Sequence, residues 1–433
     1  MRIAMISEHA SPLATLGEAD AGGQNVHVAA LAKGLAAEGH RVDVYTRRDD
    51  PDLPERVPLT HGVDVVHVDA GPPEPLPKDE LLPWMDRFGD DLAARFADPG
   101  SRPDVLHAHF WMSGLAALRA TRGGARTGSG RVPVVQTFHA LGSVKRRHQG
   151  AADTSPAERI GLESRLCREV DLVVATCRDE IRELHRLGAT DDRVEMVPCG
   201  VDLRTFAPGP GPARPADDPL RVLSLGRLVE RKGVATVVEA LARLAERGNA
   251  PVELLVAGGP PAAELDRDAE VRRLRDLAAR AGVAGRVRFL GAVAHEDIPD
   301  LIRGVDVVAC TPWYEPFGIV PLEAGACGRP VVASAVGGML DTVAHDRTGI
   351  LVPPRDPAAV AAALGRLSDR RFRRRLGAAA RVRAERRYGW AEIARQTSGA
   401  YAGVAGSAAP RHPVTARTTE TRAPLATAAG GTR

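Results

Sequence analysis

Two glutamates, Glu315 and Glu323, are separated by seven residues that begin Pro-Phe-Gly, and we call residues 315–323 the two-glutamate segment. The proline after Glu315 disfavours helical backbone at Glu315, which places that carboxylate in a loop. Pro321 suits the first position of a helix, so Glu323 is predicted in the first turn. Gly328 then ends the helix. Free backbone N–H groups at the start of this helix form an anion site. A carboxylate on each side of that site predicts a ligand with both hydroxyls and phosphates, such as a nucleotide sugar.

A second charged cluster occupies residues 225–233 (Leu-Gly-Arg-Leu-Val-Glu-Arg-Lys-Gly). A predicted strand ends at Gly226, and Lys232 lies just before the next predicted helix. The Arg227 guanidinium is a planar fork and the Lys232 ammonium is a mobile point charge, so together they suit a diphosphate. The alternative is an ordinary solvated loop between a strand and a helix. The two-glutamate segment in the same half of the chain favours the ligand-binding interpretation.

Paired glycines mark a third cluster, residues 19–27 (Ala-Asp-Ala-Gly-Gly-Gln-Asn-Val-His), which follows the first predicted strand. Gly22 and Gly23 allow the backbone to press against a ligand, and the start of the next helix favours an anion. The spacing is not G-x-G-x-x-G, so it does not indicate an NAD-dependent dehydrogenase. A purely structural turn between strand and helix is the alternative.

Histidines end two strands predicted in the first half of the chain. His109 and His139 lie at carboxyl ends of strands, where ligands bind in parallel sheets. For His107 a structural hydrogen bond is the simpler interpretation, because lone histidines are more often structural than catalytic. Several cations are scattered in the same half, and a phosphorylated acceptor would be bound if they converged on one pocket. They are Lys78, Lys145, Arg146, Arg147 and Arg159.

Strand-length apolar runs, each followed by a segment of helical period, make up most of the chain. The first series comprises residues 2–7, 41–46, 63–68, 104–109, 132–139, 171–176 and 193–197. The second series comprises residues 220–226, 252–258, 287–291, 305–311, 331–336 and 349–352. Near-continuous Val, Leu and Ile runs that alternate with helices indicate parallel sheets covered on both faces. We therefore predict an α/β fold with two Rossmann-like, doubly wound domains facing a cleft.

A Pro- and Gly-rich stretch, residues 206–217, separates the two series and is predicted to be an interdomain linker. The predicted domains are therefore residues 1–205 and 218–387. A last amphipathic segment follows at about 388–402. Residues 403–433 are rich in Ala, Thr, Pro, Gly and Arg without periodicity, so we expect them to be disordered.

Composition excludes several classes of protein. The net charge of +3 is too small to indicate nucleic-acid binding. Five cysteines without a C-x-x-C pair indicate a reducing compartment, here the cytoplasm, and argue against a disulfide framework or a zinc site. No apolar run reaches the length of about 18 residues that a membrane span needs. Residues 369–387 contain nine arginines. A solvated helix face is the simpler interpretation, and weak contact with an anionic membrane surface is the alternative.

In this order and spacing, the three clusters resemble the retaining glycosyltransferases of family 4, which have the GT-B fold. The resemblance covers about residues 1–402 and extends to residues 198–206, to Gly337-Gly338 with Asp341, and to residues 348–352. It implies that the C-terminal domain binds a nucleotide-sugar donor and the N-terminal domain the acceptor. It also implies that the last amphipathic segment completes the N-terminal domain.

The same resemblance implies roles around the donor. Arg227 and Lys232 would stabilise the leaving diphosphate, Glu323 would bind the ribose hydroxyls, and Glu315 would orient the donor sugar with His139 nearby. The catalytic residues implied are therefore Arg227, Lys232, Glu315 and His139. The donor-binding residues implied are Gly23, Arg227, Lys232, Val293, Glu315, Phe317, Gly318, Ile319 and Glu323.

Within the family, residues 22–28 and 109–114 are similar to the sucrose-phosphate synthases and to the D-inositol-3-phosphate glycosyltransferases, which use phosphorylated acceptors. The acceptor-binding residues implied are Gln24, Asn25, Lys78, Phe110, Lys145 and Arg159. Ala140 replaces a Thr or Ser, and Phe110 replaces a Tyr of the inositol branch, so two hydroxyls are lost from the acceptor side. We predict retaining transfer from a nucleotide sugar, with UDP as the expected nucleotide, to an acceptor hydroxyl. A phosphorylated sugar or polyol is one candidate acceptor.

The chemistry predicted for these residues needs neither metal nor cofactor. Two cations and a helix N-terminus directed at the diphosphate can do the work of a metal ion. No Asp-x-Asp motif stands near the three clusters. A glycosidase is disfavoured, because its two carboxyls must flank one bond. A sugar-nucleotide epimerase of the same fold and a non-catalytic nucleotide-sugar sensor are the alternatives, and the oligomeric state is left open.

Overall fold

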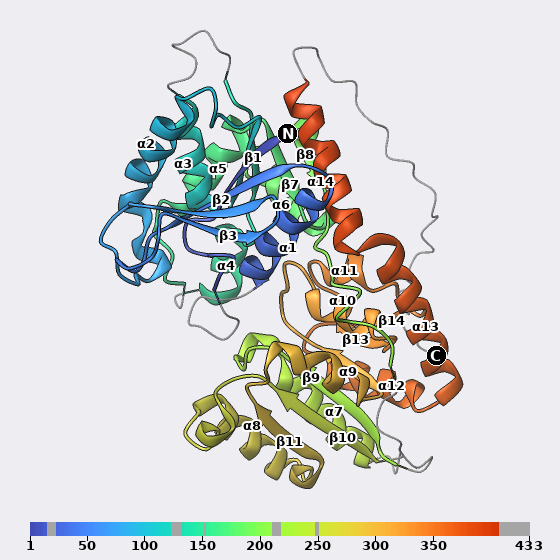
Figure 1. Cartoon of the computed structure of the whole chain (residues 1–433). Coiled ribbons are helices and arrows are strands. Elements are labelled where there is room, and N and C mark those ends of the chain that lie inside the picture. The colour runs from blue at the N-terminus through green and yellow to red at the C-terminus, as the bar shows by residue number, and fades with distance from the viewer. Residues whose placement is uncertain (15–22, 123–130, 151–152, 210–217, 247–250, 407–433) are drawn as a thin grey trace, which may run out of the picture.

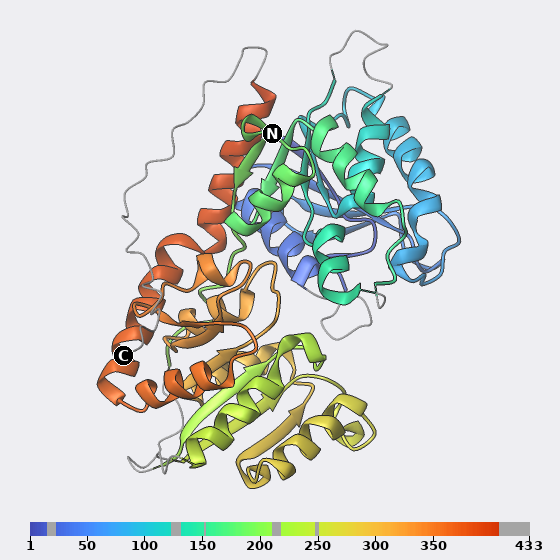
Figure 2. The ribbon, with the colours of Figure 1, turned by 180° about the vertical axis from the view of Figure 1, so that it is seen from behind.

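A computed structural model describes residues 1–14, 23–122, 131–150, 153–209, 218–246 and 251–406. These residues form two β-sheets, each flanked by helices, and the two resulting domains lie one above the other (Figure 1). The same arrangement is seen from behind in Figure 2. The predicted α/β fold with two doubly wound domains is thus confirmed.

The N-terminal sheet has the strand order β3-β4-β2-β1-β5-β6-β7-β8. Its strands are β1 (Arg2–Ile6), β2 (Arg41–Arg47), β3 (Arg56–Thr60), β4 (Val63–Val68), β5 (Val105–His109), β6 (Val134–Thr137), β7 (Leu172–Ala175) and β8 (Val194–Met196). The central strands β1, β5 and β6 are buried along nearly their whole length, as parallel strands covered on both faces are, and the ends of β5 and β6 carry polar residues. The direction in which the chain adds strands to the sheet reverses between β1 and β5. The loops after these two strands therefore flank one crevice.

Helices cover both faces of this sheet. They are α1 (Gly23–Ala37), α2 (Met85–Phe96), α3 (Trp111–Thr121), α4 (Gly142–Gln149), α5 (Arg159–Glu169) and α6 (Arg178–Arg186). The C-terminal helix α14 (Trp390–Ala405) joins them, because its Ile393, Ala394 and Tyr401 pack in the same core as Ile3 and Val28. Helices α13 (Arg370–Arg387) and α14 run along one side of both domains and connect them (Figure 1).

The C-terminal sheet has the order β11-β10-β9-β12-β13-β14, and its pairings are parallel. Its strands are β9 (Leu220–Leu225), β10 (Val252–Ala257), β11 (Val287–Gly291), β12 (Val307–Cys310), β13 (Val331–Ser334) and β14 (Gly349–Val352). With β9 as the first strand, this is the 3-2-1-4-5-6 order of a dinucleotide-binding fold. The crevice at its switch point opens between the ends of β9 and β12, where the second cluster and the two-glutamate segment begin.

The helices of this domain follow the strands in alternation. They are α7 (Val234–Glu246), α8 (Ala269–Arg280), α9 (Ile298–Arg303), α10 (Ile319–Ala326), α11 (Met339–Thr342), α12 (Pro357–Leu367) and α13 (Arg370–Arg387). Asp268, Asp356 and Asp369 cap α8, α12 and α13 by accepting backbone N–H bonds.

Several sequence-based boundaries differ from the structure. Strand β3 was not predicted, because Pro58 interrupts its pattern; it is an antiparallel edge strand, where proline is tolerated. Helix α14 continues to Ala405, three residues past its expected end, because Val404 is still buried in the core. Most of the expected linker and nearly all of the expected disordered tail lie outside the described residues.

Membrane spans and disulfides are both absent from the residues that the structure describes. None of the described helices is long and apolar enough to cross a bilayer. All five cysteines lie in described segments, and each is a buried free thiol.

Candidate active site

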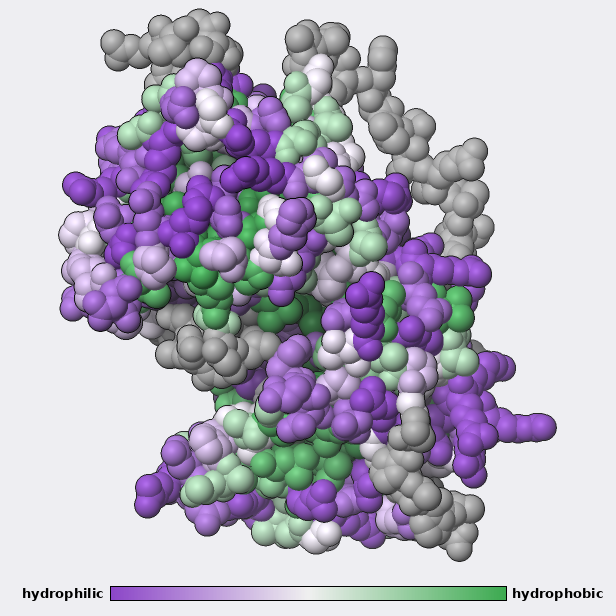
Figure 3. All heavy atoms as spheres, viewed as in Figure 1, coloured by the Kyte–Doolittle hydropathy of each residue, from purple (hydrophilic) through white to green (hydrophobic). Residues whose placement is uncertain are grey.

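A cavity of about 870 Å³ lies between the two domains. Its wall comes from the ends of β9 and β12 on one side and from the loops after β1, β5 and β6 on the other. The surface is hollowed between the domains on the left of the space-filling view (Figure 3). The cavity therefore lies where both sheets present the carboxyl ends of their strands.

Cations on the loop after β9 line the C-terminal side of the cavity. Arg227, Arg231 and Lys232 all lie in its wall. The loop returns through a left-handed Gly233 (φ 72°), where a Cβ would lie 1.9 Å from the carbonyl oxygen of Thr311. Glycine is thus required for the close approach that holds these cations beside the end of β12.

Lys232 and Glu315, which were each predicted as site residues, are in direct contact. Lys232 Nζ donates to Glu315 Oε2 at 2.5 Å, and the two side chains are only 25% and 14% exposed. Glu315 thus lies on the loop after β12, as predicted, and its carboxylate is charge-paired across the crevice. A ligand phosphate at Lys232 would share this ammonium with the carboxylate.

Helix α10 begins earlier than predicted. Gly318 is its N-cap in a left-handed conformation (φ 74°), and the helix starts at Ile319 rather than at Pro321. Glu323 therefore lies beyond the first turn instead of within it. The reason is that Gly318 reverses the chain directly after Phe317, so no further residues are needed to enter the helix. The backbone of Phe317, Gly318 and Ile319 lines the cavity.

Glu323 is half-buried and does not line the cavity directly. Burial raises the pKa of its carboxyl to about 7. The neutral and charged forms are then both populated near neutral pH, so a hydrogen-bonding ligand could shift the balance.

The N-terminal side of the cavity carries six of the predicted residues. They are Gly23, Gln24, Asn25, Lys78, Phe110 and His139. Gln24 Nε2 donates to the carbonyl oxygen of His109 at 3.3 Å, and Asn25 Nδ2 donates to the carbonyl oxygen of Ser11 at 3.0 Å. Phe110 has a positive φ of 82°, which turns the chain sharply between β5 and α3.

Four buried histidines pack together at this wall, and of these four His139 lines the cavity. His109 Nδ1 and His139 Nε2 are 2.9 Å apart, and His27 and His107 pack against the same rings. Burial lowers the pKa of His27 to about 4 and that of His107 to about 3, and it lowers the pKa of the other two well below the usual value. These rings are therefore neutral near pH 7. His139 also contacts the ring of Phe317 from the other domain, with centroids 5.5 Å apart.

Three predicted ligand residues besides Glu323 lie away from the cavity wall. Arg159 is 2% exposed, and its guanidinium donates to Glu163 at 2.8 Å and to the carbonyl oxygen of Ala140 at 2.6 Å. Lys145 Nζ lies 3.0 Å from an Asp153 carboxylate oxygen. Val293 is partly buried and packs against an apolar core cluster of the C-terminal domain. In this arrangement Arg159 braces the loop that carries His139 and Ala140.

Sequence reasoning missed several residues that the structure brings to the cavity, and Arg231 and His9 are two of them. Arg231 lines it beside Lys232, and burial lowers the pKa of its guanidinium. Its position between two charged neighbours in the second cluster was the available signal. His9 also lines the cavity, and its ring packs edge-on against Phe110 at 4.8 Å. It directly follows the first strand, where ligands are expected.

In the part of the chain that the structure describes, no group of three or more His, Cys, Asp or Glu side chains is arranged to hold a metal ion.

Two family models match the chain, one for each domain. The model described as Glycosyltransferase Family 4 matches residues 21–205, and the model described as Glycosyl transferases group 1 matches residues 212–383. The boundary between the two matches falls within the stretch expected to link the domains.

Among curated proteins, the D-inositol 3-phosphate glycosyltransferase of Xylanimonas cellulosilytica is 39% identical over 93% of this chain and 96% of its own length. The enzyme of the same name from Streptomyces bingchenggensis is 38% identical over 93% of this chain and 89% of its own.

Among solved structures, the sucrose-phosphate synthase of Thermosynechococcus elongatus superposes with a TM-score of 0.79 at 33% identity, covering 94% of this chain and all of that one. Anabaena HepE in complex with UDP-glucose gives a TM-score of 0.68 at 22% identity, covering 93% of this chain and all of that one, which speaks for the fold alone.

Proposed function

This chain is a glycosyltransferase of family 4 with the GT-B fold, and from that premise we propose the reaction it catalyses. It transfers a sugar from a UDP-sugar to an acceptor hydroxyl, with retention of the anomeric configuration and without a metal ion. The observation that carries this proposal is a single interdomain cavity whose wall holds Arg227, Lys232 and Glu315 together with the start of α10.

The proposed chemistry begins at the bond between the sugar and the diphosphate. As this bond breaks, negative charge builds on the diphosphate and positive charge on the sugar ring. Arg227 and Lys232 stabilise the leaving diphosphate, and the free N–H groups at the start of α10 add a further positive potential. These three groups supply the positive charge that a divalent metal provides in other enzymes, which supports metal independence.

The two glutamates take different roles in this proposal. Glu323 lies behind the residues of α10 that line the cavity, and its role as acceptor of hydrogen bonds from the ribose hydroxyls is taken from the family resemblance. Its raised pKa would allow the ligand to determine its charge. Glu315 and the backbone of the adjacent loop orient the donor sugar. His139 is neutral and contacts Phe317 of that loop, so it serves as a hydrogen-bonding group beside the sugar rather than as a cation.

The nucleotide is proposed to be UDP. HepE, which shares the fold, was solved with UDP and with UDP-glucose. We place the enzyme in the cytoplasm as part of the same proposal, because each of its five cysteines is a free thiol.

The acceptor is proposed to bind on the N-terminal side of the cavity, at Gln24, Asn25, Lys78 and Phe110. The curated relatives are D-inositol 3-phosphate glycosyltransferases. A phosphorylated polyol is therefore one candidate acceptor, and a phosphorylated sugar is another. Of the three cations first expected to bind its phosphate, Lys78 lines the cavity, whereas Lys145 and Arg159 do not.

The proposed reaction is tested by incubating the protein with UDP-sugars and a panel of polyols, sugars and their phosphates. Proton NMR of the product reports the anomeric configuration, and retention is expected. Conversion of a UDP-sugar to its epimer in the absence of acceptor would identify an epimerase instead. Binding of the UDP-sugar without any conversion across the panel would favour a sensor.

A further inference from the structure

Helix α11 (Met339–Thr342) touches the loop that carries Glu315. The N–H of Gly338, just before the helix, donates to the carbonyl oxygen of Glu315 at 2.9 Å. A Cβ at Gly337 would lie 2.1 Å from that same oxygen, and one at Gly338 would lie 2.5 Å from the carbonyl oxygen of Phe317. The hydrogen bond and the lack of room for a Cβ at either glycine place residues 313–318, which we call the donor loop, directly against the start of α11. We therefore expect a shift of α11 to displace the donor loop.

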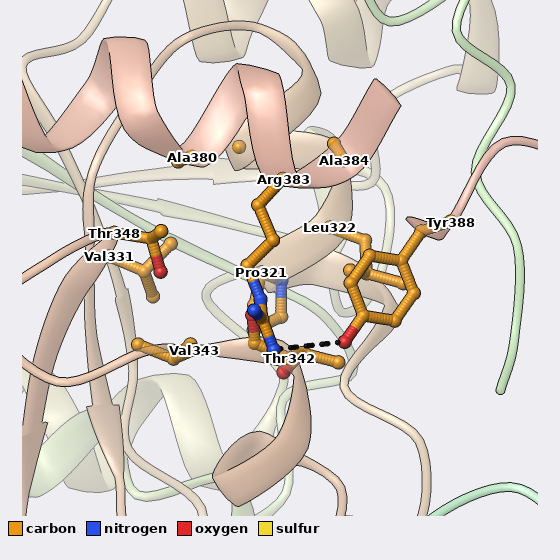
Figure 4. A pocket seen from close by; sticks show the side chains of 11 residues that line it. Pro321, Leu322, Val331, Thr342, Val343, Thr348, Ala380, Arg383, Ala384 and Tyr388 are labelled. Atoms are coloured by element: carbon orange, nitrogen blue, oxygen red, sulfur yellow. Dashed lines mark hydrogen bonds between the residues drawn. The ribbon is translucent and has the colours of Figure 1, made fainter. Parts of the chain in front are cut away.

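The other end of α11 is fixed to helix α13. Arg383 Nη2 donates to the carbonyl oxygen of Asp341 at 2.7 Å, and the Tyr388 hydroxyl donates to the same oxygen at 2.9 Å. The close-up view shows Arg383 reaching down from α13 between Pro321 and Thr342, with Tyr388 beside its guanidinium (Figure 4). The main chain of α11 is thereby held within the C-terminal domain.

The side chain of Asp341 reaches the opposite domain. Its Oδ2 accepts the backbone N–H of Arg178 at 2.8 Å, and Arg178 is the first residue of α6. The Arg178 guanidinium is 75% exposed and 3.5 Å from Oδ1, whereas the Asp341 side chain is only 14% exposed. A carboxylate at a helix N-terminus is stabilised by the unpaired N–H groups and the helix dipole. The main contact is therefore between the Asp341 carboxylate and the start of α6, not with the guanidinium.

We propose that Asp341 is a positioning residue for the donor loop. It fixes α11 against the N-terminal domain, and α11 in turn fixes the backbone of Glu315 and Phe317. The position of the loop that orients the donor sugar thus depends on how the two domains are arranged. The effect of Asp341 on catalysis rests on the proposed function of Glu315. The coupling of α6 to the loop of Glu315 through α11, which we call the mechanical link, rests on the contacts alone.

The mechanical link is tested by hydrogen–deuterium exchange without any ligand. In Asp341→Ala, exchange of the Gly338 amide and of the loop at residues 313–318 is expected to be about tenfold faster than in the wild type, the effect of losing a hydrogen bond to a charged group. Leu340→Ala is the matched control, because Leu340 is the neighbouring residue of α11 and is 44% exposed. Arg178→Ala retains the backbone N–H that Asp341 accepts. In this variant the same amides should therefore exchange at rates within about twofold of those in the wild type.

Unchanged exchange of these amides in Asp341→Ala would overturn the proposal. If Asp341→Ala does not fold, Asp341→Asn carries the test, since it keeps an oxygen acceptor and loses only the charge. Its exchange should then rise by about two- to fivefold, the worth of a charge at a helix N-terminus. If these amides exchange in Asp341→Asn at the same rate as in the wild type, the proposal is likewise overturned.

A binding measurement separates positioning from general destabilisation. Asp341→Ala should bind UDP-glucose about tenfold more weakly while its affinity for UDP stays within about twofold, because in the proposed site the loop of Glu315 and Phe317 orients the sugar, whereas Arg227 and Lys232, which Asp341 does not contact, bind the diphosphate. Equal weakening of both ligands would contradict a positioning role. A wild-type protein that binds neither nucleotide would refute the proposed function, and the exchange result would still decide the role of Asp341.

Discussion

The half-buried carboxyl of Glu323 predicts a pH dependence for donor binding. Its pKa is raised to about 7 by burial. In the proposed site the carboxylate accepts hydrogen bonds from ribose hydroxyls, so the ionised form binds the donor. UDP-glucose is the suitable ligand for the test, because its diphosphate is doubly esterified and does not titrate in this range. Raising the pH through 7 should therefore strengthen binding.

The size of the effect follows from the ionised fraction of Glu323. With a pKa of about 7, roughly one tenth of the carboxyl is ionised at pH 6 and roughly nine tenths at pH 8. The apparent affinity falls in proportion to the binding-competent fraction. The dissociation constant of UDP-glucose is therefore expected to be about tenfold larger at pH 6 than at pH 8.

Isothermal titration calorimetry at pH 6, 7 and 8 measures this directly. Repetition at pH 7 in two buffers of different ionisation enthalpy should reveal release of about half a proton on binding. Glu323→Gln cannot titrate, and its affinity should be weaker at pH 8 and independent of pH. A pH dependence that persists in Glu323→Gln, or a wild-type affinity that is constant from pH 6 to pH 8, would refute the assignment of Glu323 to the ribose.

Three further predictions concern stability, turnover and metal. The pKa of Glu323 in the folded protein lies above the usual value of 4.5, so stability is lost as the pH rises from about 4.5 to about 7. Glu323→Gln should therefore be more stable than the wild type at pH 8 by up to about 3 kcal/mol and equally stable at pH 4 in denaturant titrations. Lys232→Ala should lower the turnover of UDP-glucose by about 100-fold or more in a steady-state assay, whereas exposed Lys33→Ala should not change it. Exhaustive chelation should leave turnover intact, and complete loss that Mg²⁺ or Mn²⁺ restores would contradict the role given to the two cations.

The sheets could be predicted because parallel strands covered on both faces must be continuous apolar runs. The motifs could be placed for a related reason. Residues 225–233 and the two-glutamate segment follow β9 and β12, which are the strands at the switch point of the C-terminal sheet. Strand β3 escaped prediction, because an edge strand with Pro58 carries neither a continuous nor a strictly alternating apolar pattern.

Side-chain partners were harder to predict than positions along the chain. Arg159 was expected to face an acceptor, but Glu163, one helical turn later, takes its guanidinium into a buried pair. The i,i+4 spacing of these two residues was the available signal. The contact of Asp341 with the start of α6 joins residues 163 positions apart, and only the folded arrangement of two domains brings them together. The start of α10 was misplaced because Pro321 suits an early helical position, whereas Gly318 sets the actual turn.

The central claim is that Arg227 and Lys232 bind the diphosphate of a nucleotide sugar in the interdomain cavity. Titration of UDP-glucose into the wild type and into Arg227→Ala/Lys232→Ala, with Lys33→Ala as control, tests it most directly. We predict saturable binding to the wild type and to the control, and binding at least about 100-fold weaker to the double variant, which lacks two charge-assisted contacts. Wild-type affinity in the double variant, or no binding of UDP-glucose to the wild type, would contradict the claim.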